Sequence, residues 1–309
     1  MRFLVLLIAS LAEPLLTQAE LRQIQALAPT WKAGIPERLK SLTKSDFKRM
    51  LSADSPRTQP SMVRPIHVPE SEDPAPDHFD FREEYPQCIT EVIDIGLCSS
   101  SWAHSAVDAF SHRRCLTGLD QEATRYSAQY ILSCASTNGC FGFSTQGDIA
   151  WDFIATTGVP LESCVKYTDY NETQSSWPCP SVCNDNSFLE IYKPDGYEGV
   201  GFNSERLKRA VAFRGPMQAM FAVYEDFTYY LEGIYSHTYG NRAGFLSVEI
   251  VGYGTSDEGQ DYWIVKNYWG PDWGEDGYFR IVRGQDECQI EEATYGAIIN
   301  SDKPSTIAK

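Results

Sequence analysis

The sequence predicts an α+β protein in which a helical half precedes a half built from antiparallel strands. In the first half, apolar residues recur at helical spacing, and cap or stop residues bound several of these runs. The second half holds runs rich in β-branched and aromatic residues, separated by Gly, Asp and Asn, as is typical of strands. Helices and strands in separate blocks indicate an α+β fold.

The elements follow from these patterns in chain order. Leu21–Met50 has helix-like patterning interrupted at Gly34-Ile35-Pro36, and Ser52–Pro76, rich in Pro, Ser and acidic residues, reads as an extended linker. The predicted helices are Trp102 to about Arg114, Ala128–Ser133 after a Ser127 cap, Gly147–Thr157, and Asn203 or Ser204 to the stop at Gly215-Pro216. The predicted strands are Met217–Val223, Ser247–Tyr253, Tyr262–Lys266, Tyr278–Val282 and Tyr295–Ile299.

Composition limits the classes of function. The chain has 309 residues, 42% of them hydrophobic, which is enough for one large domain or two half-domains. Its formal net charge of −16 argues against nucleic acid or an anionic membrane surface as the main partner. An ordinary solvated acidic surface explains this charge, and an acidic compartment or a cationic partner is the sharper interpretation.

The N-terminus is typical of a secretory signal over residues 1–19. Arg2 precedes an apolar run, Phe3–Ala9, and the small residues before Ala12 or Ala19 offer two cleavage sites. Elsewhere no apolar run approaches the ~20 residues that span a bilayer. We therefore expect a protein of the secretory pathway without a transmembrane segment.

Nine cysteines are consistent with that compartment. In a secreted chain, eight of them plausibly form four bridges, which leaves Cys288 unpaired. A zinc site is the competing reading, but only five histidines and no Cys-x-x-Cys pair are present, so no metal is expected. We also expect no cofactor.

The stretch Asp94–Ala106 contains the first candidate site. It reads Asp-Ile-Gly-Leu-Cys-Ser-Ser-Ser-Trp-Ala-His-Ser-Ala, and apolar residues at helical spacing follow it. Ser99–Ser101 therefore lie where a loop becomes a helix N-terminus, a position that suits a nucleophile because unpaired N–H groups point toward it. The plainer interpretation is that Ser101 only caps the helix.

This stretch resembles the nucleophile loop of the papain family of cysteine proteases, usually Gln-Gly-Ser-Cys-Gly-Ser-Cys-Trp-Ala. In that alignment Cys98 is the structural cysteine, and Trp102-Ala103 match. Ser101 stands where the nucleophilic Cys belongs, and Ile95 stands where the oxyanion-hole Gln belongs. The resemblance covers about residues 77–300, with a weaker match over 21–50, and implies a two-lobed fold with a cleft between the lobes.

Two further motifs locate the other catalytic positions. The family's His lies in Gly-His-Ala-Val-x-Ile-Val-Gly-Tyr-Gly, and here the run Phe245–Gly254 places Leu246 at that His. Its orienting Asn lies in Tyr-Trp-x-Val-Lys-Asn-Ser-Trp-Gly, which Tyr262–Gly270 matches almost throughout, with Asn267 retained. Leu246 cannot transfer a proton, so Asn267 is expected to be structural and to need other partners.

The expected cleft contains Gly142, Phe143 and Trp269. The family's Gly-Cys-x-Gly-Gly loop pairs with the substrate backbone, and Phe143 replaces its last Gly. A phenyl ring there would crowd the cleft, unless it folds into the core.

The resemblance is strongest to cathepsin B-like proteins. Trp31-Lys32-Ala33-Gly34 resembles their short pro-segment, and Phe79–Arg82 resembles the start of their mature region, although an ordinary mobile arm would also explain the N-terminal part. We therefore divide the chain into a signal peptide (1–19), a pro-segment with linker (20–76) and a papain-like domain (77–309). No insertion like cathepsin B's occluding loop lies between Cys140 and Cys183.

The resemblance also implies covalent features. It suggests the disulfides Cys88–Cys115, Cys98–Cys140, Cys134–Cys179 and Cys164–Cys183, although the sequence alone cannot fix this connectivity, with Cys288 at a position usually left unpaired. Asn171 begins an Asn-Glu-Thr sequon that is either glycosylated or an unmodified loop.

These departures predict a catalytically inactive homologue, secreted or lysosomal, that acts by binding. Its expected partners are peptides, protease inhibitors or a sister protease, and it is expected to be a monomer. Two alternatives stay open: a structural or adhesive secreted protein, and a hydrolase with residual or altered activity through Ser101. For the latter, His104 is the histidine nearest in sequence, although we expect it to face the core; His237 matches a non-catalytic position.

Overall fold

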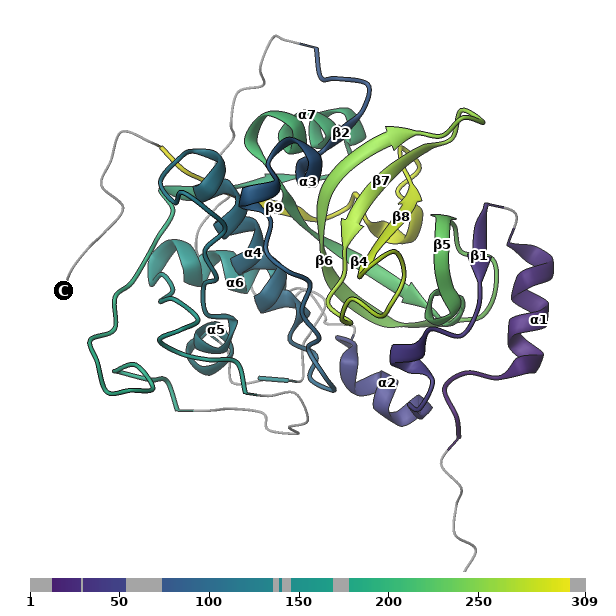
Figure 1. The fold of residues 1–309 in the computed structure, drawn as a ribbon, viewed down its shortest axis with the longest axis horizontal. Coiled ribbons are helices and arrows are strands. Elements are labelled where there is room, and N and C mark those ends of the chain that lie inside the picture. Colours follow the sequence, from purple (N-terminus) through teal and green to yellow (C-terminus); the bar gives the residue numbers. More distant parts are fainter. Residues whose placement is uncertain are drawn as a thin grey trace, which may run out of the picture.

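Helices and strands occupy separate halves of the computed structural model, which describes residues 13–28, 30–53, 74–135, 139–140, 146–168 and 178–300. Helices α4 (Ser101–Leu116), α5 (Ala128–Cys134) and α6 (Gln146–Thr156) form one half, and most strands form the other (Figure 1). The predicted α+β class is therefore confirmed. None of the helices in the described part of the chain has the length and apolar character that a membrane crossing requires.

Local sequence signals positioned the longer helices well. Ser127 caps α5 through its side chain, as predicted, and Asn203 rather than Ser204 caps α7 (Ser204–Arg214). Gly215 ends α7 at a φ of 97°, a left-handed value that glycine adopts without strain. Helix α4 begins one residue earlier than predicted and continues to Leu116.

The strands in the described part of the chain form one sheet in the order β1-β5-β8-β7-β6-β4-β9-β3, and β2 pairs with β6 beside this path. All neighbours are antiparallel except β5 and β8, which pair in parallel. The prediction of a purely antiparallel half was therefore wrong, because β7 and β8 insert between β5 and β6. The strands are β1 (Trp31–Ala33), β2 (Phe79–Asp80), β3 (Gly196–Val200), β4 (Met217–Tyr224), β5 (Tyr230–Tyr235), β6 (Arg242–Thr255), β7 (Asp261–Lys266), β8 (Tyr278–Val282) and β9 (Thr294–Ile298).

Two hydrophobic cores define two lobes. The first lies among α4, α5 and α6 and includes Trp102, Ile131 and Trp151, all fully buried. The second lies among the strands and includes a cluster of aromatic side chains around Phe227. The two-lobed arrangement that the resemblance implies is present.

Residues 13–53, here called the N-terminal segment, pack against the strand lobe. The segment contains α1 (Gln18–Leu27), β1 and α2 (Lys44–Met50). The helix-like pattern expected over Leu21–Met50, with its break at Gly34-Ile35-Pro36, is therefore two helices, and the strand β1, which was not predicted, lies just before that break. Strand β1 pairs antiparallel with β5, and the Trp31 Nε1 donates a hydrogen bond to the Ser236 carbonyl (3.0 Å). Figure 1 shows the segment along the outer side of the strand lobe.

The start of this segment bears on the two signal-cleavage sites. Leu15 is buried, and its N–H donates to the Leu42 carbonyl (2.9 Å). Thr17 caps α1, and its N–H donates to the Tyr229 hydroxyl (2.7 Å). Leu15 and Thr17, which lie in the expected signal peptide 1–19, thus have packing partners in the described part of the chain.

Candidate functional site

Ser101 is the first residue of α4, where the two lobes meet. The cap position belongs to Ser100, whose hydroxyl pairs with the Tyr167 hydroxyl (2.9 Å) instead of capping the helix. The Ser101 side chain is fully buried, and its Oγ accepts a hydrogen bond from the Ser247 N–H of β6 (3.1 Å). The interpretation of Ser101 as the N-cap was therefore wrong by one residue, and β6 holds its hydroxyl instead.

Leu246 lies one residue before that contact. It pairs with Phe221 of β4 in the sheet register and is 1% exposed. Its isobutyl side chain has neither a donor nor an acceptor. Strand β6 therefore brings a backbone N–H to Ser101, but the side chain at the adjacent position has no proton-transfer group.

Ile95 and Asn267 both form hydrogen bonds with the backbone of Tyr268. The Ile95 N–H donates to the Tyr268 carbonyl (3.1 Å), and the Ile95 carbonyl accepts from the Tyr167 hydroxyl (2.9 Å). The Oδ1 of Asn267 accepts the Tyr268 N–H (2.8 Å), whereas its fully buried Nδ2 has no partner among the described residues. An unsatisfied buried amide donor costs about 1–3 kcal/mol of folding free energy. The expected replacement partners of the Asn267 side chain are thus present for its Oδ1 but not for its Nδ2 within the described residues.

The described residues that lie over this site come largely from the N-terminal segment. Ser52 exchanges two backbone hydrogen bonds with Phe245 (2.8 and 2.9 Å), and its hydroxyl pairs with the Ser99 hydroxyl (3.0 Å). A Cβ on Gly244 would lie 2.9 Å from the Leu51 Cβ, so a residue without a side chain is needed at this crossing. Ser52 was predicted to belong to a linker, and no sequence pattern marks it as a site residue.

Two side-chain contacts hold the segment in place. Arg38 binds the Asp94 carboxylate with two nitrogens, the Nη2–Oδ1 distance being 2.9 Å, and Asp94 also accepts the Gly96 N–H (2.8 Å). The Phe47 ring meets the Trp269 ring edge-on, with centroids 5.6 Å apart. Trp269, predicted to line the cleft, is thus fully buried under the segment.

Three predicted positions lie outside the described residues: Gly142, Phe143 and Asn171. The four disulfides of the structure are Cys88–Cys115, Cys98–Cys140, Cys134–Cys179 and Cys164–Cys183, the pairs that the resemblance implies. Cys288 has no disulfide and is buried, and burial raises the pKa of its thiol. The Cys98–Cys140 bridge ties the nucleophile loop to the stretch Gly139–Cys140.

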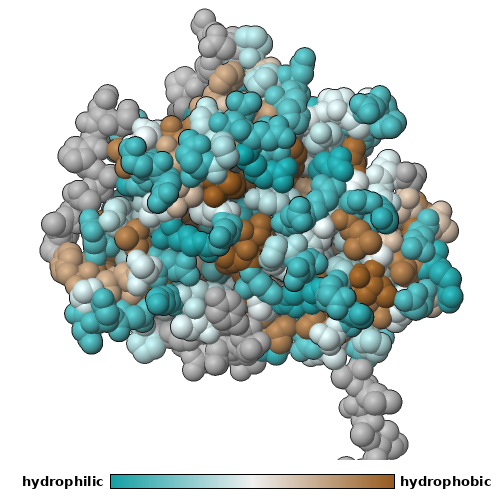
Figure 2. Space-filling model, viewed as in Figure 1, coloured by the Kyte–Doolittle hydropathy of each residue, from teal (hydrophilic) through white to brown (hydrophobic). Residues whose placement is uncertain are grey.

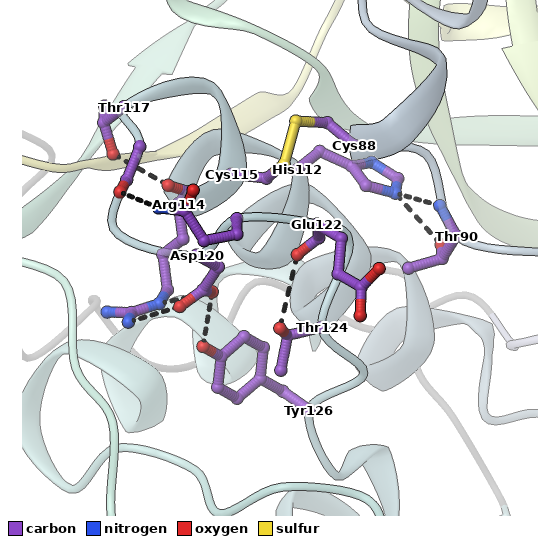
Figure 3. Close-up of a disulfide and its surroundings, with 12 residues drawn as sticks. Cys88, Thr90, His112, Arg114, Cys115, Thr117, Asp120, Glu122, Thr124 and Tyr126 are labelled. Carbon is purple, nitrogen blue, oxygen red and sulfur yellow. Dashed lines mark hydrogen bonds and ion pairs between the residues drawn. A yellow bond between two sulfur atoms is a disulfide. The ribbon is translucent and has the colours of Figure 1, made fainter.

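A buried polar network links the lobes behind the site. The Thr90 N–H donates to the Nε2 of His112 (3.0 Å), so Nδ1 carries the proton and donates to Glu249 (2.7 Å). The Lys266 ammonium binds Asp108 (2.7 Å) and the Thr90 hydroxyl (2.6 Å). Figure 3 shows His112 and Thr90 beside the Cys88–Cys115 disulfide. This disulfide joins α4 to the short 3₁₀ turn Pro86–Cys88.

This network contains the metal-ligand group found among the described residues, namely Asp108, His112 and Glu249. The ammonium of Lys266 already lies against Asp108, and the proton on His112 Nδ1 already points at Glu249. A divalent cation would have to displace both. The network is better explained as an internal support that fixes α4 against β6 and β7.

His104 faces the core, and in the described part of the chain it forms no hydrogen bond with Ser101. Its ring meets the Tyr167 ring edge-on at 4.5 Å, and its Nε2 is buried without a partner. Burial lowers the pKa of His104 to about 3, against a smaller opposing effect of Asp108. The imidazole is therefore neutral and weakly basic, as expected for a core residue. His237 instead pairs with the buried Asp226 (3.1 Å).

The depressed pKa of His104 predicts a loss of stability in acid. The unfolded chain binds a proton near pH 6.5 and the folded chain only near pH 3, so the free energy of unfolding falls as the pH drops through this window. The limiting slope is about 1.4 kcal/mol per pH unit. We expect His104→Phe to flatten the fall in urea midpoint between pH 6.5 and 4, with His78→Phe at the exposed His78 as the control. Equal slopes in all three proteins would contradict the burial argument.

The comparisons with known proteins agree with this geometry. A model of the papain family of cysteine proteases matches residues 75–298, so the chain belongs to that family. Within the family it is a cathepsin B-like protein. It is 47% identical over 302 residues to cathepsin B-like CP1 of Giardia intestinalis, covering 96% of this chain and 99% of the relative. It is 34% identical to cathepsin B-like cysteine proteinase 4 of Caenorhabditis elegans, covering 96% and 97%.

Solved structures include proforms of such enzymes. The procathepsin B S9 of Trypanosoma congolense superposes with a TM-score of 0.84 at 32% identity, covering 93% of this chain and 99% of that one. The procathepsin L 3 of Tenebrio molitor superposes with a TM-score of 0.72 at 25% identity, covering 91% and 88%. A pro-segment in the place of the N-terminal segment is consistent with these neighbours.

Proposed function

We propose that this chain is a catalytically inactive cathepsin B-like protein that acts by binding. The observation that carries the proposal is Leu246: the side chain beside the Ser101 contact is buried and apolar. A papain-type reaction needs an imidazole to take the nucleophile's proton and return it to the leaving amine. A hydroxyl is a weaker nucleophile than a thiolate, and nothing at position 246 activates it.

The surrounding groups support the same conclusion. Ile95 supplies no side-chain donor where a developing oxyanion would need one. The buried Nδ2 of Asn267 has no partner among the described residues. This is expected of an asparagine that once oriented a histidine and has kept its place without it. Ser101, Leu246, Ile95 and Asn267 all lie buried, so the scaffold of the site is kept while its reactive groups are absent.

The alternative, hydrolysis through Ser101 with His104 as base, has less support. An imidazole whose pKa is about 3 is a weak base. The Oγ of Ser101 already accepts the Ser247 N–H (3.1 Å). A hydroxyl-directed fluorophosphonate distinguishes the two: labelling of wild type but not of Ser101→Ala would favour the hydrolase.

The binding partners we propose are extended peptides, protease inhibitors or a sister protease in the secretory pathway, a lysosome-like compartment or outside the cell. The N-terminal segment supports this choice, because Ser52 pairs with Phe245 as an added strand would. The same edge of β6 offers its backbone groups to another extended chain when the segment leaves.

Opening the segment tests binding directly. Arg38→Ala with Phe47→Ala removes the Asp94 pair and the Trp269 contact, so labelled extended peptides should bind at least tenfold more tightly than to wild type. Mass spectrometry should recover the peptide uncut. Lys32→Ala, at an exposed ion pair of the same segment, is the matched control and should bind like wild type. Cleavage of the peptide, or no gain in binding, would overturn the proposal.

The segment should also stay attached in acid. Hydrogen bonds from Thr43 lower the pKa of Asp46, so the cap of α2 is intact above the ordinary value of 3.8 and is lost only as the pH falls below it. We expect the intact mass to include the N-terminal segment after incubation at pH 4–5, because the chain has no means to cut itself. Loss of residues 20–76 at a rate that rises with protein concentration would contradict this expectation. A mixture of inhibitors against contaminating proteases serves as control.

A further inference from the structure

A pocket lies in the helical lobe, beside the start of α5 (Figure 1). Its volume is about 500 Å³, within the range of pockets that hold small ligands. On the face shown in Figure 2, apolar residues form mostly small separate patches among polar ones, which is ordinary for a protein surface. The pocket is therefore a better candidate for selective binding than these patches. We call it the Tyr167 pocket, and its lining includes Arg125, Leu161, Glu162, Ser163, Lys166 and Tyr167.

The walls of the Tyr167 pocket come from two segments that are joined to each other. The Glu162 N–H donates a hydrogen bond to the Arg125 carbonyl (2.9 Å), so the backbones of the two segments pair at this point. The turn that follows Glu162 is tied down by the Cys164–Cys183 disulfide. The shape of the pocket is therefore fixed by the fold itself, and a ligand would not have to order its walls.

Tyr167 and Leu161 give the pocket an apolar part. Tyr167 is buried, and its hydroxyl donates to the Ile95 carbonyl (2.9 Å) and pairs with the Ser100 hydroxyl (2.9 Å). These two bonds hold the aromatic ring in one position. Together with the side chain of Leu161, the ring offers a fixed surface against which an apolar group of a ligand can be buried.

Two opposite charges of the pocket lack a partner in the described part of the chain. They are the Glu162 carboxylate and the Lys166 ammonium, which also do not pair with each other. Arg125 differs, because its Nη2 already donates to the Glu91 carbonyl (3.2 Å) and the Glu91 carboxylate (3.4 Å). An unpaired lysine or glutamate is ordinary on an open surface, but here both charges line one pocket beside an apolar wall. This combination matches a ligand that carries both charges and an apolar group.

We propose that the Tyr167 pocket binds short apolar peptides of two or three residues through both of their ends. The C-terminal carboxylate of the peptide pairs with Lys166, and its N-terminal ammonium pairs with Glu162. An apolar side chain lies against Leu161 and Tyr167. The ends of an extended dipeptide are about 7 Å apart, which suits two protein charges that do not pair with each other. Hydrogen bonds between charged groups supply the strongest polar contacts available to such a ligand.

The test uses the full chain and calorimetric titration with leucyl-leucine, its N-acetyl form and its C-terminal amide. Each blocked form should bind at least tenfold more weakly than the free dipeptide, because it lacks one of the two charges. Free leucine should also bind at least tenfold more weakly, because it lacks the second side chain.

Two variants assign the ends of the peptide to the two charges. Lys166→Gln should weaken the free dipeptide by about tenfold and leave the amide unchanged, whereas Glu162→Gln should weaken the free dipeptide and leave the N-acetyl form unchanged. Lys48→Gln and Glu258→Gln, at exposed positions outside the pocket, are the matched controls and should bind like wild type. Both pocket variants should keep the thermal midpoint, because neither side chain has a partner in the part of the chain that the structure describes.

Several results would overturn the proposal. They are the absence of heat with leucyl-leucine, equal binding of the blocked forms, and equal binding of free leucine, which would assign the pocket to amino acids. Arg38→Ala with Phe47→Ala uncovers the candidate site without touching this pocket, so dipeptide binding should not change. A gain in that variant would place the dipeptide at the candidate site instead. The proposal does not depend on whether the protein is inactive, so its failure and that of the proposed function are distinguishable.

Discussion

Purified protein is expected to hydrolyse fluorogenic dipeptide substrates of papain-like enzymes no faster than buffer at any pH from 4 to 8. In the function proposed above, Ser101, Leu246 and Ile95 take the places of the nucleophile, the base and the side-chain oxyanion donor, and Asn267 has no imidazole to orient. In subtilisin, loss of the nucleophile or base alone lowers turnover by about 10⁶. An effect of that size places any residual rate below detection.

The assay needs protein from a host without papain-like proteases, with Ser101→Ala prepared in parallel. Because the N-terminal segment covers the site through Ser52 and Phe47, the protein is also tested after an added protease has cut the segment away and has been inhibited. Turnover that is present in wild type and absent in Ser101→Ala would show that the chain is an enzyme. Equal traces in both would identify a contaminant.

Ser101→Cys alone should not restore an enzyme. A free thiol has a pKa near 8.5, so only a few per cent is thiolate at neutral pH. The N-terminus of α4 lowers that pKa somewhat, but no imidazolium is present to stabilise the thiolate. At 1% exposure, Leu246 also leaves no acid to protonate the leaving amine.

The groups of the site act as one unit, so their restoration should be non-additive. Ser101→Cys with Leu246→His should be weakly active, partly because the Oδ1 of Asn267 already accepts the Tyr268 N–H (2.8 Å) and must be shared with the new imidazole. Adding Ile95→Gln restores an oxyanion donor, worth roughly 10²–10³ where such donors have been removed. Adding Phe143→Gly opens the predicted substrate edge, and the combination should give the large gain.

Each variant of this series is assayed in two ways: by labelling with a thiol-directed epoxide and by peptide turnover. His104→Phe in the Ser101→Cys background is the control. Strong turnover from Ser101→Cys that this second change abolishes would mean that His104 serves the site despite its buried position.

The sequence determined much of the framework because the responsible signals are local. A side-chain cap and a terminal glycine mark α7 at Asn203 and Gly215, and Ser127 marks α5. Strand β8 matches its prediction residue for residue, because a short run rich in aromatic and β-branched residues between turn residues suffices to define it. The register of the long motifs places Ser101, Leu246 and Asn267 at the expected catalytic positions.

Only the tertiary structure decided how distant segments meet. Strand β1 is three residues long and exists because β5, about 200 residues away, supplies its partners, so no local pattern predicts it. The parallel pairing of β5 and β8 arises from the insertion of β7 between β8 and β6. Ser52 became part of the site through two backbone bonds to Phe245, which any residue type can make.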